Sequence, residues 1–270
     1  MDHTNRTNNG HDGREDEDWA GLSNGAKLSW GIVKPSRRGP KGELSIAKIV
    51  EAAVEIADRE GLAGLSMNRV ASALGFTTMS LYRYIASKED LLVLMQEAVS
   101  GADIPPERED ADWRAEMKGY VHACIQVFVK HPWYGDIPIA GIPTTPNALR
   151  FVDWALRTMR HFPVNDYEKM SFLLLLSSYA RSYGIIHRDA MRMIQAGGTM
   201  EGFNGMMAGP ALRKLVKPDL YPELHPVVAS GIFTGEQEQH NPVANDLEFG
   251  LERILDGIAA YLERKGMSAT

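Results

Sequence analysis

The side chains with the most informative chemistry lie in residues 77–83, which read TTMSLYR. Threonine can hydrogen-bond to a base edge or contact a thymine methyl group, and methionine adds an apolar contact. Ser80 and Tyr82 carry hydroxyls that can donate hydrogen bonds to the phosphate oxygens of a duplex. This combination of side chains favours contact with a DNA groove.

The stretch needs two short helices to present it. Apolar spacing predicts one helix that follows Ser66 and ends at Gly75, and a second that begins at Thr77 or Thr78. Gly75 suits the turn between them, because the chain there is expected to need a positive φ, which a Cβ atom makes costly. Together these helices form a predicted helix-turn-helix, whose second helix can enter the major groove.

Neighbouring segments complete the domain that contains the predicted helix-turn-helix, which we call the head. A longer helix begins after Ser45 and stops at Gly61, and residues 87–90 read SKED, a capping box that opens a further helix at Lys88. Lys88 can reach a phosphate or be a solvated charge. Tyr82 can contact DNA or pack inside a small core, and Thr77 can be an N-cap, a DNA contact or both.

A basic cluster precedes the head, although the chain as a whole has a formal charge of -6. Residues 34–94 carry more Lys and Arg than Asp and Glu, and their densest basic segment contains Arg37, Arg38 and Lys41. Such a cluster is either a solvated tail or, beside a helix-turn-helix, an arm for phosphates or the minor groove. Residues 1–33 are polar and acidic, and we expect them to be disordered.

The segment IVEAAVEIADREGLAGLSMNRVASALGFTTMSLYRYIASKEDLL resembles the DNA-binding domain of TetR-type transcriptional regulators. The resemblance implies that Thr77 to Ser80 face the groove, that Tyr82 and Lys88 hold phosphates, and that the basic arm follows the minor groove. The candidate DNA-contacting residues are Arg37, Arg38, Lys41, Asn68, Arg69, Thr77, Thr78, Met79, Ser80, Tyr82, Arg83 and Lys88.

The remaining residues, 95–270, predict further helices and no strand, so the fold is expected to be all-α. Helices are predicted at about 112–130, from Thr145-Pro146, at about 165–194 and at about 245–265. The apolar run in residues 172–176 predicts a central position for the third of these. The end of the chain, NDLEFGLERILDGIAAYLERKG, resembles the last helix of the tetracycline-repressor subclass. That resemblance implies a homodimer built on the helices at 165–194 and 245–265.

The resemblance also implies a small-molecule cavity among the central helices. Its candidate lining residues are Tyr120, Cys124, Trp154, Phe172, Leu175 and Tyr179, for each of which ordinary core packing is an alternative. Such a lining would suit a flat, partly hydrophobic effector of unknown identity. The groups with which the tetracycline repressor holds its drug and magnesium have no counterparts around residues 138–146, so we expect no metal and no cofactor.

Other function classes find less support. Cys124 is the single cysteine, and the start of the chain lacks the apolar segment of a secretory signal, which together predict a cytoplasmic protein. The apolar runs are far too short to span a membrane. No G-x-S-x-G, H-E-x-x-H or P-loop motif is present.

The predicted function is a repressor that a small molecule releases from a palindromic operator. The alternative is an all-α enzyme or small-molecule-binding protein with a degenerate helix-turn-helix.

Overall fold

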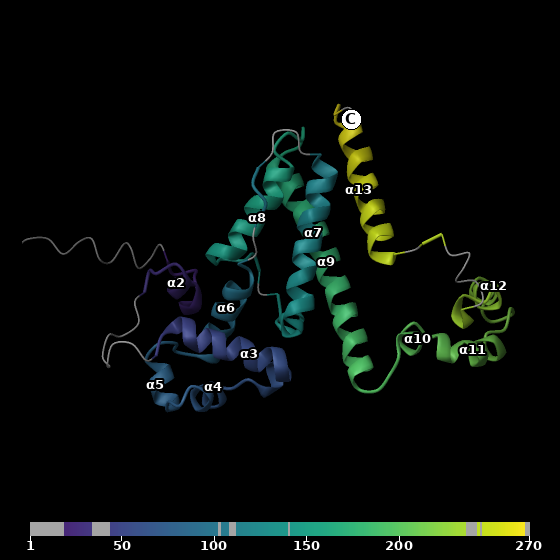
Figure 1. The fold of residues 1–270 in the computed structure, drawn as a ribbon. Helices are drawn as coiled ribbons and strands as arrows, with labels where there is room; N and C mark the ends of the chain where they lie inside the picture. The colour runs from purple at the N-terminus through teal and green to yellow at the C-terminus, as the bar shows by residue number, and fades with distance from the viewer. Residues whose placement is uncertain are drawn as a thin grey trace, which may run out of the picture. The chain divides into compact units, whose positions relative to one another are not determined.

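The computed structural model describes residues 19–33, 44–101, 104–107, 112–139, 141–235, 242–243 and 245–267. Within these ranges every regular element is a helix, so the predicted all-α fold is confirmed (Figure 1). None of these helices combines the length and apolarity needed to cross a membrane. The chain divides into two compact units, one made of residues 1–109 and 136–157 and the other of residues 110–135 and 158–270.

The first unit contains the predicted DNA-binding head. Its helices are α2 (Asn24–Ser29), α3 (Ile46–Gly64), α4 (Met67–Ala73), α5 (Thr78–Tyr82), α6 (Lys88–Val99) and most of α8 (Pro146–Thr158). The residues before three predicted helices, Ser45, Ser66 and Ser87, are N-caps, and each accepts a backbone N–H of the helix that follows it. Gly61, the predicted stop, interrupts α3 with a φ of 71°.

Two predictions for this unit are wrong in part. Residues 24–29 form the helix α2, although they lie in the segment predicted to be disordered. The helix is stabilised by its N-cap Ser23 and by packing against α6. The capping box predicted for α6 is only half formed. Ser87 accepts the N–H of Asp90, but the Asp90 carboxylate bonds to the Ser87 hydroxyl and to the N–H of Gly25. Tertiary packing has redirected this side chain.

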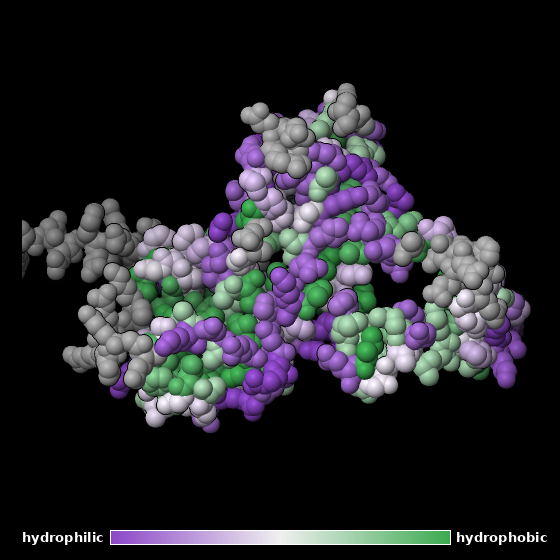
Figure 2. Space-filling view, in the orientation of Figure 1, coloured by the Kyte–Doolittle hydropathy of each residue, from purple (hydrophilic) through white to green (hydrophobic). Residues whose placement is uncertain are grey.

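The second unit is built on two long helices. Its elements are α7 (Trp113–Lys130), η1 (Pro132–Asp136), α9 (Asp166–Gln195), α10 (Met200–Phe203), η2 (Met206–Ala208), α11 (Gly209–Leu215), α12 (Leu224–Ala229), η3 (Ile232–Thr234) and α13 (Asp246–Arg264). Asn165 opens α9 with a complete capping box that includes Glu168. The segment from α10 to η3 leaves hydrophobic residues at its surface (Figure 2). Met207, for example, is 76% exposed.

Close packing of α7 against α9 forms the core of this unit. A Cβ atom at Gly184 would lie 2.6 Å from the Cβ of Phe128, so only glycine lets the two helices approach this closely. Leu173 and Leu176 are buried on the inner side of α9, but Leu174 is 67% exposed in the single chain. The apolar run of α9 is therefore covered on only part of its circumference.

Candidate nucleic-acid interface

The turn that leads into α5 depends on Gly75, which has a φ of 74°. Its N–H donates to the carbonyl of Ser72 at 3.2 Å, and the N–H of Phe76 donates to the carbonyl of Ala71 at 2.9 Å. These paired bonds are a Schellman ending of α4. The positive φ predicted for Gly75 is confirmed, and it sets the direction in which α5 starts.

Hydroxyl groups are ordered at the start of α5. Thr77 is the N-cap: its side chain accepts the N–H of Ser80 at 3.3 Å, and the Thr77 and Ser80 hydroxyls lie 2.9 Å apart. The hydroxyl of Thr78 donates a longer bond of 3.4 Å to the side chain of Asn68 on α4. Mutual hydrogen bonds therefore orient these side chains at the accessible end of the helix.

The helix α5 has one buried side and one exposed side. Leu81, and Ile85 just beyond the helix, are fully buried, whereas Met79 is 72% and Tyr82 is 45% exposed. Arg83 is exposed as well. A five-residue helix is not stable alone, so the buried anchors hold the exposed side chains in place. The structure brings the candidate residues of α5 together on a side that a duplex could contact.

Arg69, another candidate, lies in an exposed ion-pair cluster on α3 and α4. Its guanidinium lies 2.6 Å from a carboxylate oxygen of Glu60, which also pairs with Arg59 at 2.9 Å. Hydrogen bonds from Arg59 and Arg69 hold the pKa of Glu60 below its usual value. Exposed pairs of this kind contribute little to stability, so a phosphate could replace Glu60 as the partner of Arg69. A hollow beside them is lined by Ile56, Arg59, Ser66, Asn68, Arg69, Ser72 and Ala73.

Lys88 is half-buried and has a structural partner that sequence reasoning missed. Its ammonium donates a 2.8 Å hydrogen bond to the carbonyl of Leu65, the C-cap residue directly after α3. A lysine carries three donors, so this bond leaves others for a phosphate. The candidate arm residues Arg37, Arg38 and Lys41 lie outside the described residues.

Of the candidate ligand-lining residues, the structure brings Tyr120 and Cys124 together on α7. Tyr120 is buried. Burial raises the pKa of the Tyr120 hydroxyl, and it raises the pKa of the Cys124 thiol to about 12, so both side chains are neutral near pH 7. This part of α7 can offer an apolar surface with two neutral hydrogen-bonding groups, a phenol and a weaker thiol.

The other candidates have different surroundings. The ring of Phe172 lies 5.7 Å from that of Tyr261, and the hydroxyl of Tyr179 donates to the carbonyl of Leu247 at 2.8 Å, so both side chains of α9 contact α13. Leu175 is 46% exposed in the single chain. Trp154 is buried in the first unit. The shared lining of these residues stays a prediction.

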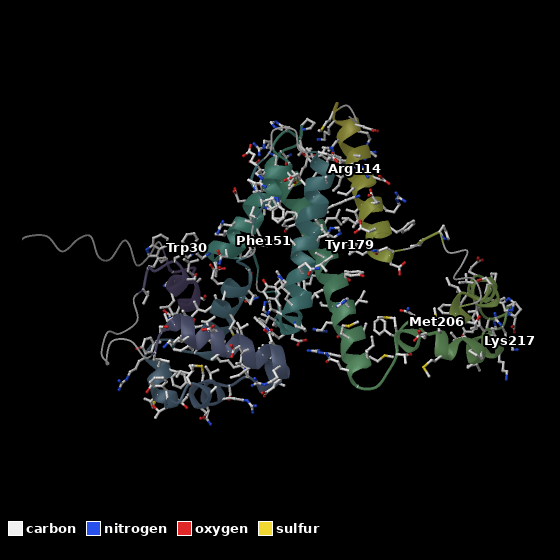
Figure 3. All side chains as sticks on the ribbon, viewed as in Figure 1. Trp30, Arg114, Phe151, Tyr179, Met206 and Lys217 are labelled. Carbon is white, nitrogen blue, oxygen red and sulfur yellow. The ribbon has the colours of Figure 1, made fainter. Side chains whose placement is uncertain are left out.

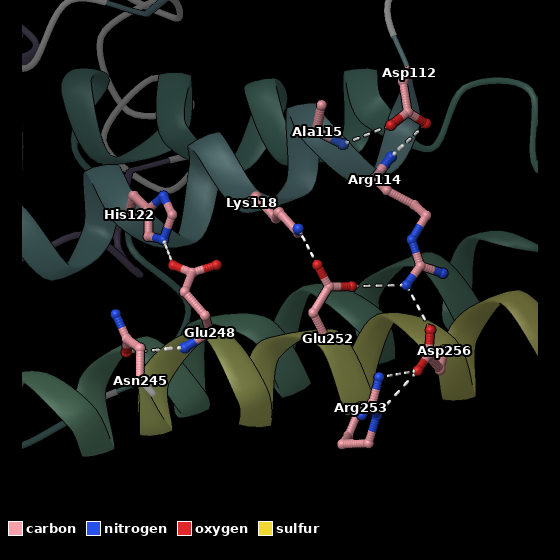
Figure 4. Close-up of polar contacts among 10 residues, drawn as sticks. All are labelled: Asp112, Arg114, Ala115, Lys118, His122, Asn245, Glu248, Glu252, Arg253 and Asp256. Atoms are coloured by element: carbon pink, nitrogen blue, oxygen red, sulfur yellow. Dashed lines mark hydrogen bonds and ion pairs between the residues drawn. The ribbon is translucent and has the colours of Figure 1, made fainter. Parts of the chain in front are cut away.

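A ladder of charges links α7 to α13 in the second unit (Figure 4). Its contacts are Arg114 with Asp256 at 2.6 Å, Arg114 with Glu252 at 2.9 Å, Lys118 with Glu252, and His122 with Glu248 at 2.6 Å. On each helix the members are spaced by four residues, which places them on one face. That spacing is visible in the sequence and could have predicted the antiparallel pairing.

Comparisons with known proteins agree with this geometry. A model of bacterial regulatory proteins of the tetR family matches residues 49–95, and a model of the tetracyclin repressor-like C-terminal domain matches residues 105–262. The HTH-type transcriptional repressor DrrR1 of Streptomyces coeruleorubidus is 34% identical over 253 residues, which cover 90% of this chain and 88% of that protein.

Solved structures share the fold. The Streptomyces coelicolor TetR family protein ActR in complex with actinorhodin has a TM-score of 0.66 at 24% identity, covering 80% of this chain and 96% of that one. A possible TetR family transcriptional regulator from Streptomyces coelicolor A3(2) has a TM-score of 0.58 at 26% identity, covering 80% and 100%. The model of the C-terminal domain covers more than half of the chain, and the tetR-family model covers the helix-turn-helix separately. This protein therefore belongs to the tetR family of bacterial regulatory proteins.

Proposed function

We propose that this protein is a transcriptional repressor that binds a palindromic operator as a homodimer and leaves it when a small aromatic or hydrophobic molecule binds its C-terminal domain. The observation that carries the proposal is the two-sided α5, with Leu81 buried and Met79 and Tyr82 exposed. Family membership supports the same role, and it favours a regulator over the alternative of an enzyme. DrrR1, the relative with 34% identity, is named a repressor.

On DNA, α5 would lie in the major groove, which is about 12 Å wide and accepts one helix. Met79 and the hydroxyls of Thr77 and Thr78 would contact base edges, while Tyr82 and Lys88 would bind phosphates. Phosphate contacts release counterions, so the affinity should fall steeply as salt is raised. One short helix reads few base pairs, and a two-fold dimer would read two half-sites about one helical turn apart.

The dimer would be formed by α9 and α13, as the family resemblance implies. Large apolar side chains of α9 reach the surface of the single chain, including Tyr167 at 88% and Leu174 at 67% exposed, and Ile186 is exposed as well. On α13, Phe249 is also exposed. Apolar surface of this kind on long helices is expected where a second copy packs.

Release from DNA would follow a two-state linkage. A ligand that binds the C-terminal domain would shift α6, and the separation of the two α5 helices would no longer match successive grooves. Such a ligand lowers DNA affinity only by its preference for the second state, and a tenfold loss needs about 1.4 kcal/mol of preference. Tyr120 and Cys124 on α7 are the candidates whose neutral, weakly polar groups suit an aromatic effector. ActR of Streptomyces coelicolor, which shares this fold, has been solved in complex with actinorhodin, and this supports a ligand-binding role for the C-terminal domain here.

Selection of duplexes from a random pool tests the proposal without knowledge of the operator. We expect the protein to enrich a palindromic sequence, and footprinting should show two protected half-sites. Tyr82→Phe should weaken binding to the selected and to random duplexes alike, because it removes a phosphate contact. Failure to enrich any sequence, with a folded dimer present, would contradict the proposal.

A further inference from the structure

The short helix α2 is attached to α6 by a buried hydrogen bond and by backbone packing. The N–H of Gly25 donates to the Oδ1 of Asp90 at 2.6 Å, and the contact is buried. A Cβ atom on Gly25 would lie 2.8 Å from the backbone oxygen of Asp90 and 2.9 Å from the Cβ of Val93. Only glycine therefore allows this docking, since the first of the opposing atoms belongs to the backbone of α6.

The far end of α2 is attached to a second segment of the same unit. The indole N–H of Trp30, labelled in Figure 3, donates to the carbonyl of Thr144 at 2.7 Å. Thr144 lies two residues before the start of α8. The end of α2 is itself well defined: Gly31 has a φ of 69°, and the N–H of Ile32 donates to the carbonyl of Lys27 at 3.0 Å, as in a Schellman motif.

A third set of bonds joins α6 to α8 directly. Both carboxylate oxygens of Glu97 accept the backbone N–H of Asn147 at 3.0 Å. The side-chain amide of Asn147 donates back to the carbonyl of Glu97 at 3.0 Å. Hydrogen bonds thus connect α2 with α6, α6 with α8, and α2 with the turn before α8. Three elements joined pairwise in this way resist relative movement more than two joined at one point.

We propose that α2 is an internal clamp that positions α6 for DNA binding, and that Gly25, Trp30 and Asp90 are positioning residues. The proposal rests on the proposed function, since it concerns operator binding. The route to the DNA-contacting side chains is short, because Lys88 in the first turn of α6 bonds to Leu65 between α3 and α4. With α2 undocked, α6 and the start of α8 gain freedom that DNA binding must remove, and the affinity falls.

The test uses the full chain and a duplex selected by the wild-type protein from a random pool. Gly25→Ala should undock α2, and Gly21→Ala is its matched control, since a Cβ there meets nothing within 4 Å. Trp30→Phe keeps an aromatic ring and removes only the bond to Thr144. Asp90→Leu removes the acceptor for Gly25, whereas Asp90→Asn keeps one and should restore wild-type behaviour.

Two readouts separate positioning from general stability. Gly25→Ala and Asp90→Leu should weaken binding about fivefold or more, the lower range of typical couplings between sites, with an unchanged salt dependence because no phosphate contact is lost. Amide hydrogen exchange at residues 147–150, in the first turn of α8, should slow when DNA binds the wild-type protein. The slowing of exchange on DNA binding should be smaller in Gly25→Ala, in Asp90→Leu and in Trp30→Phe.

If Gly25→Ala and Asp90→Leu fail to unfold cooperatively, Trp30→Phe still tests the clamp. The Trp30 side chain is 47% exposed, so replacing it leaves the core intact. Wild-type exchange response together with affinity within twofold of the wild type would overturn the clamp and leave the proposed function standing. A folded wild-type protein that selects no duplex would overturn both.

Discussion

The ammonium group of Lys88 lies 2.8 Å from the carbonyl oxygen of Leu65, 23 residues earlier in the chain. This bond ties the first turn of α6 to the corner between α3 and α4, where the helix-turn-helix begins. The same side chain was predicted to bind phosphate, and its remaining donors allow both roles.

Lys88→Met should therefore have two effects. Loss of the bond to Leu65 should lower the free energy of unfolding by about 1 kcal/mol. Loss of one phosphate contact should reduce the slope of log affinity against log salt by about 1 per head. Chemical denaturation and a salt titration measure the two effects separately. An unchanged salt slope would show that Lys88 acts only through Leu65.

Met79→Ala should change sequence preference without a loss of stability. The side chain is 72% exposed and carries little packing energy, so the melting temperature should stay within the error of the wild type. Loss of an apolar contact to a base should instead alter the motif enriched from a random pool. An identical motif for both proteins would remove Met79 from the base-reading set.

The charge ladder should contribute a small, salt-sensitive coupling. A double-mutant cycle with Lys118→Met and Glu252→Gln should give a coupling of roughly 0.2–1 kcal/mol, since both side chains are about 30% exposed and solvent screens them. The coupling should shrink in 1 M salt, where the Debye length is about 3 Å. A coupling that does not respond to salt would mean that packing, rather than charge, joins these residues.

Two glycines in long helices should respond oppositely to alanine. Gly184→Ala forces a Cβ to within 2.6 Å of Phe128 and should cost about 1–3 kcal/mol. Gly257→Ala meets nothing within 4 Å and should stabilise α13 by up to about 1 kcal/mol through helix propensity. Calorimetry of the two variants checks the signs. A neutral Gly184→Ala would show that α7 and α9 can separate without cost.

Glu168 should make stability depend on pH in acid. A hydrogen bond from Tyr261, with others from the backbone of Asn165 and from Lys265, lowers the pKa of Glu168 from 4.5 to about 2. A carboxylate with a depressed pKa stabilises the fold above its unfolded value, and that contribution is lost as pH falls toward the folded value. The stability difference between the wild type and Glu168→Gln should therefore be constant above about pH 5 and shrink between about pH 4.5 and 2. Glu263→Gln, at an exposed position of α13, is the control; a difference independent of pH would contradict this role.

Much of the fold follows from signals that act over a few residues. The helices that follow Ser45 and Ser66, the cap at Thr77 and the positive φ of Gly75 lie where the sequence predicts them. Caps and turns depend on a side chain and on backbone groups two to five residues away, so they can be predicted from the sequence alone. The exposed side of α5 follows in the same way, from the spacing of its buried residues.

The sequence alone thus determined an all-α chain with a helix-turn-helix, and it predicts a candidate DNA-contacting stretch in residues 77–83. Only the tertiary structure decided which distant residues meet: Asp90 with Gly25, Lys88 with Leu65, Glu97 with Asn147, and Arg114 with Asp256. Local periodicity places each of these side chains on a face of its own helix but does not say which helix lies opposite. That choice is made by the packing of whole helices, in which burial of apolar surface outweighs any single polar contact.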